Sequence, residues 1–363
     1  MTASRRTFLT GTAALGAGAA TLPLGQLFAA ERRLPLTIGA SHPLTDPPVA
    51  PLKSIVMGKA NEELEALKSS YRIDWTEAFG GTLYNFKETL AAVSGGVTDI
   101  GWIASIFVPA QLPLQNIMYS TLFSSNSVRL SVNVMNELND KNKWFQQEWE
   151  NNKVVFFGAC VADGYNLMTK FPVQSLDDLK GKKIVGAAAV APWIEALGAA
   201  AVVGALPTFY SQLQTGVADG AVIHATGAWP VKLHEVTPYL HLVDTGPVTF
   251  GGVGMNAAAF KRLPPEVQNV LRKLGRAYSD ENARLVEVGY DAAIKNMVAG
   301  GARLTKMPEA DRQKWANSAP PMGKLWVDDN EKRGIPARDI MKEFMETVRA
   351  HGGKPLRDWD KEL

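Results

Sequence analysis

The chain has 363 residues, of which 46% are hydrophobic and 20% charged. This is the composition of a globular protein with room for two domains, and it excludes the disordered and fibrous classes. Arg5 and Arg6 account for the net charge of +2, because the chain from Glu31 onward has 36 basic and 36 acidic residues, a balance that excludes a general attraction to nucleic acid or acidic lipid.

An export signal is predicted over residues 1–30. Arg5 and Arg6 precede a stretch rich in Gly, Ala and Leu that has no further charge until Glu31, and the segment SRRTFL resembles a twin-arginine signal. We expect cleavage near Ala29 or Ala30, no stable membrane insertion afterwards, and a periplasmic mature protein exported by the twin-arginine route. A retained membrane anchor is the alternative.

Strand and helix patterns alternate after the signal. LPLTIGASHP predicts a strand that ends in a loop, APLKSIVMGKANEELEALK has apolar residues at helical spacing, and YRIDWTEAF alternates like a strand. NFKETLAAVSGGVTDIGWIA predicts a helix, a Gly-Gly stop and a strand. NKVVFFGACVA predicts a buried strand. It contains Cys160, the only cysteine, which excludes an internal disulfide and which we expect to be a packed core residue rather than a nucleophile.

The segment GKKIVGAAAVAPWIEALGAAAVVGALP, residues 181–207, is nearly long enough for a membrane span. Pro192 and three glycines interrupt it, however, and predict a strand over 184–186, a short helix over about 190–197 and a strand over 201–205. Before it, Ser175 is the predicted cap of another helix, with Asp177 and Asp178 in the first turn. The segment is therefore interpreted as a βαβ unit.

A long helix is predicted from LPPEVQ onward. Pro264 and Pro265 stand at its beginning, and Gly300 and Gly301 follow its end. A helix of thirty-odd residues could span both lobes of a two-lobed molecule. The sequence has no repeat of 20 to 50 residues, which excludes solenoid folds.

Sequence motifs typical of catalytic or metal-binding sites are scarce. The five histidines lack the spacing of a zinc helix, no G-x-S-x-G occurs, and the glycines of GGVGMN do not match a dinucleotide or phosphate loop. We therefore expect no catalytic residues, no metal and no cofactor. An exported enzyme built from scattered residues is the second hypothesis, after a binding protein.

Several segments occur together in a fixed order: TIGASHPLTDPP, LYNFKETLAAVSGGVTDIG, SLDDLKGKKI, ALGA, FYSQLQTGVADG and KLHEV. On these segments the chain, from residue 36 to about 315, resembles the solute-binding proteins of tripartite ATP-independent periplasmic (TRAP) transporters. The resemblance implies an α/β, two-lobed periplasmic binding protein fold with a cleft between the lobes. It also implies hinge strands near 154–162 and 241–250, and the long helix spanning both lobes.

The implied division assigns 31–162 and 251–290 to lobe I, and 163–250 and 291–363 to lobe II. The implied function is capture of a small organic solute in the cleft and its delivery to a TRAP membrane permease. Lobes that both contact the solute favour the closed state, which the permease then accepts.

The ligand-binding residues depart from the pattern of the family. The arginine that usually follows K-I and grips a carboxylate is replaced by Val185, and the segment ADGYNLMT, residues 162–169, lacks the second arginine. Ala221 to His224 replace a polar segment. A conventional dicarboxylate is therefore not expected, whereas a neutral, aromatic or hydrophobic solute, or a cation over ring faces, suits the site. An organic acid held by Lys87, Lys170, His224 or backbone N–H groups is the alternative.

When the chain is matched to the segments of the family, the candidate ligand-binding residues all lie near the expected cleft. They are His42, Tyr84, Trp102, Ser105, Tyr165, Asn166, Val185, Trp193, Leu206, His224 and Trp229. The competing interpretation is that the aromatic residues belong to the core and that His224 satisfies a backbone group.

Overall fold

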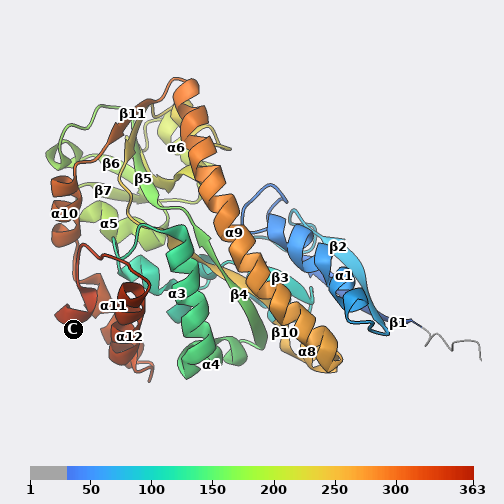
Figure 1. Cartoon of the computed structure of the whole chain (residues 1–363). Helices are drawn as coiled ribbons and strands as arrows, with labels where there is room; N and C mark the ends of the chain where they lie inside the picture. Colours follow the sequence, from blue (N-terminus) through green and yellow to red (C-terminus); the bar gives the residue numbers. More distant parts are fainter. Residues whose placement is uncertain (1–30) are drawn as a thin grey trace, which may run out of the picture.

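The computed structural model describes residues 31–363 (Figure 1). The predicted twin-arginine signal, 1–30, lies outside the described residues. Within them no helix has both the length and the apolar composition that a membrane crossing requires.

The first sheet has five strands in the order β2-β1-β3-β10-β4. Its strands are β1 (Arg32–Gly39), β2 (Tyr71–Ala78), β3 (Ile100–Ile103), β4 (Val154–Ala162) and β10 (Val248–Asn256). β1 runs parallel to β2 and β3, whereas β10 is antiparallel to both β3 and β4. Cys160 on β4 is fully buried, and burial raises the pKa of its thiol to about 12, so the prediction of a packed core cysteine is confirmed.

The second sheet has six strands in the order β11-β9-β5-β8-β6-β7. They are β5 (Tyr165–Thr169), β6 (Lys183–Gly186), β7 (Ala200–Val203), β8 (Gly220–His224), β9 (Tyr239–Leu242) and β11 (Arg303–Lys306). The carboxyl ends of the parallel strands β6 and β8 place Gly186 and His224 at the same edge of this sheet.

The segment 181–207 forms the predicted βαβ unit. Strand β6 leads into a 3₁₀ turn (Ala188–Val190) and helix α5 (Ala191–Glu195), with Pro192 in the first turn, and β7 then pairs parallel to β6. The apolar run is therefore core of the second sheet, because Ile184 and Ile194 are both fully buried.

The long helix is α9 (Pro265–Ala299), close to the predicted bounds. Its first half packs Leu271 and Tyr278 into the core of the first sheet, and its second half packs Ala293 and Met297 into the core of the second. Figure 1 shows α9 running diagonally from one sheet to the other. A Cβ atom on Gly158 of β4 would lie 2.1 Å from the carbonyl oxygen of Gly275, so these glycines permit the close crossing of strand and helix.

The chain passes twice more between the sheets. It leaves β4 through Asp163 and Gly164 to enter β5, and it returns from β9 through 243–247 into β10. The second crossing, predicted as one strand near 241–250, is thus two strands joined by a loop. Asp244 and Gly246 in this loop have positive φ angles of 55° and 94°.

The remaining helices cover the sheets and form a C-terminal group. They are α1 (Gly58–Ala66), α2 (Thr89–Ser94), α3 (Val128–Lys141), α4 (Lys143–Asn151), α6 (Leu206–Gln214), α7 (Ala225–Ala228), α8 (Ala257–Arg262), α10 (Glu309–Ser318), α11 (Met322–Glu331) and α12 (Ala337–Ala350). The first predicted helix begins as a π-helical segment, Leu52–Met57, before α1, and the helix that Ser175 caps is a 3₁₀ segment, Leu176–Leu179.

The C-terminal helices contact parts of both halves of the chain. The Trp315 indole donates to the carbonyl oxygen of Trp193 (2.9 Å) beside the second sheet, and the Trp326 indole donates to that of Pro113 (3.3 Å) in the segment after β3. Together with α3 they enclose one large core that includes Trp193, Trp315 and Trp359.

Candidate ligand-binding cleft

A continuous series of aromatic side chains runs from the first sheet to the second. Neighbouring ring centroids in this series lie 5.1 to 6.4 Å apart. We call it the aromatic row, and in spatial order it consists of Phe86, His42, Trp102, Phe250, His224, Tyr165, Trp193 and Tyr119. The row brings aromatic rings from both sheets together at the point where the chain crosses between them.

Phe250 lies at the centre of the row because β10 is irregular there. The pairing of β10 with β4 shifts register between Thr249 and Gly252, and Gly251 has a φ of 84°. Such a bulge re-aims a side chain. The indole nitrogen of Trp102 donates a hydrogen bond of 2.9 Å to the carbonyl oxygen of Phe250 and holds the two rings together.

His224 is the polar member of the row that lies nearest the crossing. It ends β8, and its Nδ1 accepts a hydrogen bond from the backbone N–H of Gly227 (3.0 Å), so the side chain caps α7. Because Nδ1 is an acceptor, the neutral ring has its proton on Nε2. No described residue lies within hydrogen-bond distance of Nε2, and the side chain is 14% exposed.

Asp163, the first residue after β4, holds this arrangement in place. Its buried carboxylate accepts hydrogen bonds from the backbone N–H groups of Ala225 (2.7 Å) and Thr226 (3.3 Å) and from the Thr226 hydroxyl. Its Oδ1 also lies 3.6 Å from Nδ1 of His224. The first crossing therefore positions the capped end of β8.

Asp46 approaches the same region from the loop after β1. Burial raises the pKa of its carboxyl group to about 6, and His224 is the charged neighbour that opposes this rise. The loop is fixed to α9, because the carbonyl oxygen of Pro47 accepts from Asn282 Nδ2 (3.2 Å) and that of Pro48 accepts from the Tyr278 hydroxyl (2.6 Å).

His42, in the same loop, presents a neutral ring. Its Nδ1 lies 2.9 Å from the Ser41 hydroxyl, and burial lowers the pKa of the imidazole. The site thus has two imidazoles and two carboxyl groups, and no arginine or lysine is a member of the row.

A cavity of about 740 Å³ lies beside the last residues of the row. Tyr119 and Pro192 line it together with Ile106 and Asn116 from the segment after β3 and with Leu325 and Trp326 of α11. Its volume is in the range of small-molecule pockets.

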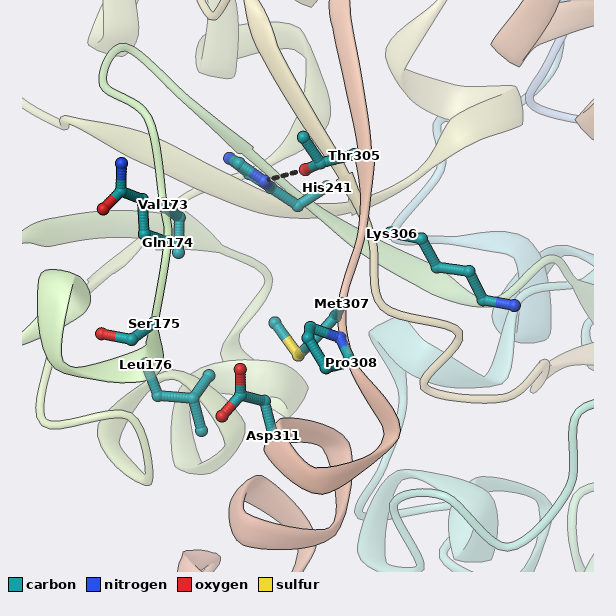
Figure 2. Close-up of a pocket in the computed structure, with 10 residues that line it drawn as sticks. All are labelled: Val173, Gln174, Ser175, Leu176, His241, Thr305, Lys306, Met307, Pro308 and Asp311. Atoms are coloured by element: carbon teal, nitrogen blue, oxygen red, sulfur yellow. Dashed lines mark hydrogen bonds between the residues drawn. The ribbon is translucent and has the colours of Figure 1, made fainter.

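A smaller cavity, about 160 Å³, surrounds His241 (Figure 2). The imidazole of His241 is within 2.5 Å of the Thr305 hydroxyl and 3.2 Å of the Thr169 hydroxyl, and burial lowers its pKa to about 4. Both ring nitrogens are therefore engaged, and none of the ten residues that line this cavity belongs to the aromatic row.

Five of the residues predicted from the sequence meet in the row. They are His42, Trp102, Tyr165, Trp193 and His224. Trp102, Tyr165 and Trp193 are almost completely buried, so their packing role is established whichever ligand contacts they make.

The other six predicted residues lie outside the row. Val185 is in the core between β6 and α6, and Leu206 and Trp229 are half-buried in the same half of the molecule. The Ser105 hydroxyl donates to Asn116 Oδ1 (3.0 Å), and Asn166 accepts from the Val243 N–H (3.1 Å) and donates to the Gly164 carbonyl (3.3 Å), so both are engaged.

Tyr84 is buried, and its hydroxyl has no hydrogen-bond partner among the described residues. Trp229 stacks on His234, with centroids 5.1 Å apart, rather than on a member of the row.

The two lysines named as alternative carboxylate partners differ in position. Lys87 is exposed, and its ammonium lies 5.9 Å from the centroid of Phe86, at the end of the row. Lys170 directly follows β5, at the opposite end of the strand from Tyr165, and its backbone N–H donates to the Asp219 carbonyl oxygen (3.0 Å). Only Lys87 is placed to reach the row.

Sequence reasoning missed three members of the row, Phe86, Phe250 and Tyr119, and also Asp46 and Asp163. The polar pair Asp163-Gly164 directly after a strongly apolar strand was a usable signal, because a carboxylate there ends the strand and meets free N–H groups. Phe250 and Asp46 had no comparable local signal.

Comparison with known proteins decides the family. The model of the bacterial extracellular solute-binding proteins, family 7 (DctP), matches residues 63–327, which is well over half of the chain. The chain belongs to this family. The predicted membership of the TRAP solute-binding proteins is therefore confirmed, and the family consists of receptors rather than enzymes.

This family 7 protein has a curated relative in Sulfitobacter sp. (strain NAS-14.1), a solute-binding protein that is 31% identical over 187 residues. The match covers 51% of this chain and spans about half, 53%, of the relative's length.

Solved structures confirm the two-lobed α/β fold. A TRAP periplasmic solute-binding protein from Desulfovibrio salexigens, in an open complex, has a TM-score of 0.73 and 22% identity over 90% of this chain and 98% of its own. A TRAP solute-binding protein from Rhodoferax ferrireducens, in complex with copurified benzoate, has a TM-score of 0.75 and 20% identity over 88% and 98%.

Proposed function

We propose that this family 7 protein is the periplasmic receptor of a TRAP transporter, and that it captures a small organic solute between its lobes and delivers it to a membrane permease. The observation that supports this most is the aromatic row, because its rings come from both sheets and meet where the chain crosses between them. A solute that contacts both ends of the row favours the closed state.

The export route and the division into lobes belong to the same proposal. The Arg5-Arg6 signal would deliver a folded protein to the periplasm. We propose lobe I as 31–162 with 251–290 and lobe II as 163–250 with 291–363, and the C-terminal group then contacts lobe I through Trp326 and Pro113.

The solute contacts are proposed to come from the exposed edges of the row, with His42, Phe250 and His224 at the centre. A conventional dicarboxylate does not fit this site, because the position of the usual arginine is Val185, which is fully buried. A monocarboxylate is the second candidate, since the Rhodoferax ferrireducens protein was solved with benzoate and Lys87 lies at the end of the row.

Binding without turnover distinguishes a receptor from an enzyme on the same scaffold. A thermal-shift screen of organic acids, amides, amines and polyols should give hits that raise the melting temperature and shrink the radius of gyration in small-angle scattering. Hits should be recovered unchanged after prolonged incubation. Steady formation of product from a hit would contradict the proposal.

Two half-buried aromatic residues provide a matched pair of variants. Phe250→Ala should abolish the shift produced by the best hit, because Phe250 joins Trp102 to His224. Trp229→Ala, outside the row, should leave the shift in place. The reverse pattern would place the solute elsewhere.

A further inference from the structure

The cavity of about 740 Å³ at the end of the aromatic row has walls from three separate parts of the chain. We call it the α11 cavity. Its lining includes Ile106 and Pro113 from the segment after β3, Ala188 and Ala189 from the loop after β6, and Leu325 from α11. An occupant that contacts all three walls favours the arrangement of the molecule in which these walls meet.

Two hydrogen bonds fix the α11 wall to the segment after β3. The Trp326 indole donates to the carbonyl oxygen of Pro113 (3.3 Å), and the Arg333 guanidinium donates to the carbonyl oxygen of Ala110. The helix and the charged residues that follow it are therefore held in place before any ligand arrives, which lowers the cost of binding.

The first turns of α11 give the cavity an apolar side. Met322, Leu325 and Trp326 share one face of the helix, because they are three and four positions apart, and all three line the cavity. Tyr119 and Pro192 add apolar surface from the other two walls. Leu325 is 57% exposed, so the apolar body of a ligand can cover it, and burial of such surface is favourable.

The other end of α11 brings charged groups to the same cavity. Lys332 and Arg333 both line it, and neither forms an ion pair with any residue from 31 to 363. Asp328, also in the lining, is paired with Lys324 (2.5 Å). Asp329 is then the one carboxylate of the lining that remains for two cations, and the lining has an excess of one positive charge.

Arg333 keeps hydrogen-bond donors for an anion. A guanidinium has five N–H donors. In Arg333 one N–H is donated to the Ala110 carbonyl oxygen and one to Asn330 Oδ1 (3.5 Å). The other N–H groups are available to a carboxylate, whose planar shape matches that of the guanidinium.

We propose that the α11 cavity is a second binding site, separate from the centre of the row, for an amphipathic monocarboxylate. Its carboxylate is held by Arg333 and Lys332, and its apolar ring body lies against Leu325 and Trp326. This inference goes beyond the receptor function proposed above, because it assigns a site that the solute at the centre of the row does not occupy.

Three compounds separate the contribution of the head from that of the body, by calorimetric titration of the purified protein at pH 7.5. They are 2-naphthylacetate, its uncharged analogue 2-(2-naphthyl)ethanol, and acetate. The naphthylacetate should bind at least about a hundredfold more tightly than acetate, since only its ring system covers the apolar wall. It should bind about threefold or more tightly than the alcohol, which is the gain expected from an exposed ion pair.

Acetate that binds as tightly as naphthylacetate overturns the role of the apolar wall. An alcohol that binds as tightly as naphthylacetate overturns the role of the two cations. No binding of either naphthyl compound overturns the site itself.

Two matched pairs of exposed variants locate the ligand. Arg333→Gln should remove the preference for naphthylacetate over the alcohol, whereas Arg338→Gln, at a residue of α12 that lies 3.7 Å from Glu331, should keep it. Leu325→Glu places a charge on the apolar wall and should lower the affinity for both compounds by about tenfold or more. Leu304→Glu, on β11 and outside the cavity, should change neither affinity.

The outcome for Phe250→Ala keeps this site distinct from the receptor function. Binding of naphthylacetate should survive Phe250→Ala and be weakened by Leu325→Glu. If Phe250→Ala abolishes it and Leu325→Glu does not, the compound binds at the row, and the second site is rejected while the receptor function stands. If the wider screen finds no solute at the row but naphthylacetate binds as expected, the receptor function is rejected and the second site stands.

Discussion

A Cβ atom on Gly251 would lie 1.7 Å from the carbonyl oxygen of Ile103 on the neighbouring strand. Gly251 also has a φ of 84°, a region that side chains disfavour. The bulge that aims Phe250 at Trp102 and His224 therefore depends on glycine at this position for two independent reasons.

Gly251→Ala should lower the free energy of unfolding by at least about 3 kcal/mol, because the strained φ and the backbone clash both add to the cost. Gly216→Ala is the matched control. Gly216 has a φ of 81°, but nothing lies within 4 Å of the added Cβ, so only the conformational cost of about 1 kcal/mol remains. Urea denaturation measures both variants, and equal losses would show that the contact with Ile103 is unimportant.

Asp163→Asn should impair both stability and solute binding. The substitution replaces a carboxylate that accepts three hydrogen bonds from Ala225 and Thr226, and we expect a loss of about 2 to 3 kcal/mol. His224 would lose its fixed position, so the affinity for the best solute should fall.

The control for this prediction is Asp178→Asn. Asp178 also accepts two backbone N–H bonds, from Gln174 and Ser175, but it is exposed and is not a member of the row. The Asp178→Asn substitution should reduce the free energy of unfolding slightly and leave the affinity for the solute unchanged. Calorimetric titration of both variants separates the two roles, and unchanged affinity in Asp163→Asn would remove the positioning role of Asp163.

Glu148 should make stability depend on pH. This buried carboxyl group accepts from the N–H groups of Leu114 (2.7 Å) and Gln115 (3.3 Å), yet burial dominates and raises its pKa to about 8. Because the folded-state pKa is above the unfolded value of 4.5, its contribution to stability is complete below pH 4.5 and is lost as the pH rises through about 8.

Guanidinium denaturation between pH 6.5 and 8.5 measures this effect, since the pKa values of about 6 for Asp46 and about 4 for His241 lie below that window. The free energy of unfolding should fall across the window in the unmodified protein. In Glu148→Gln the fall should be much smaller, because the side chain has no charge to acquire. An identical fall in both proteins would exclude Glu148 as its source.

Val185→Arg should not create a carboxylate site. Val185 is fully buried in the core between β6 and α6, and its Cγ2 would lie 3.2 Å from a Cβ on Gly204. A guanidinium there would be buried without a partner, at a cost of several kcal/mol.

Val203→Arg on the adjacent strand β7 is the control, because Val203 is 59% exposed and tolerates a charge. Thermal unfolding should show a large loss for the first variant and almost none for the second. A stable Val185→Arg protein with new affinity for benzoate would show that this position reaches the cleft after all.

The sequence by itself determined the elements and their order. The alternation of strands and helices, the interrupted apolar run that became β6, α5 and β7, and the bounds of α9 between Pro265 and Gly300 all depend on local periodicity and on breakers such as Pro192. The departure from the arginine pattern at Val185 was likewise readable from the chain alone.

Only the tertiary structure decided which side chains form the site. Trp102 meets Phe250 across 148 positions of sequence, and Asp163 meets Thr226 across 63. Such partners leave no periodic trace, because their contact depends on a bulge, on two crossings between sheets and on the packing of loops against α9. Val185 and Trp193 show the same division. Local sequence placed both residues in the correct elements, but residues far away in the chain decide that both are buried.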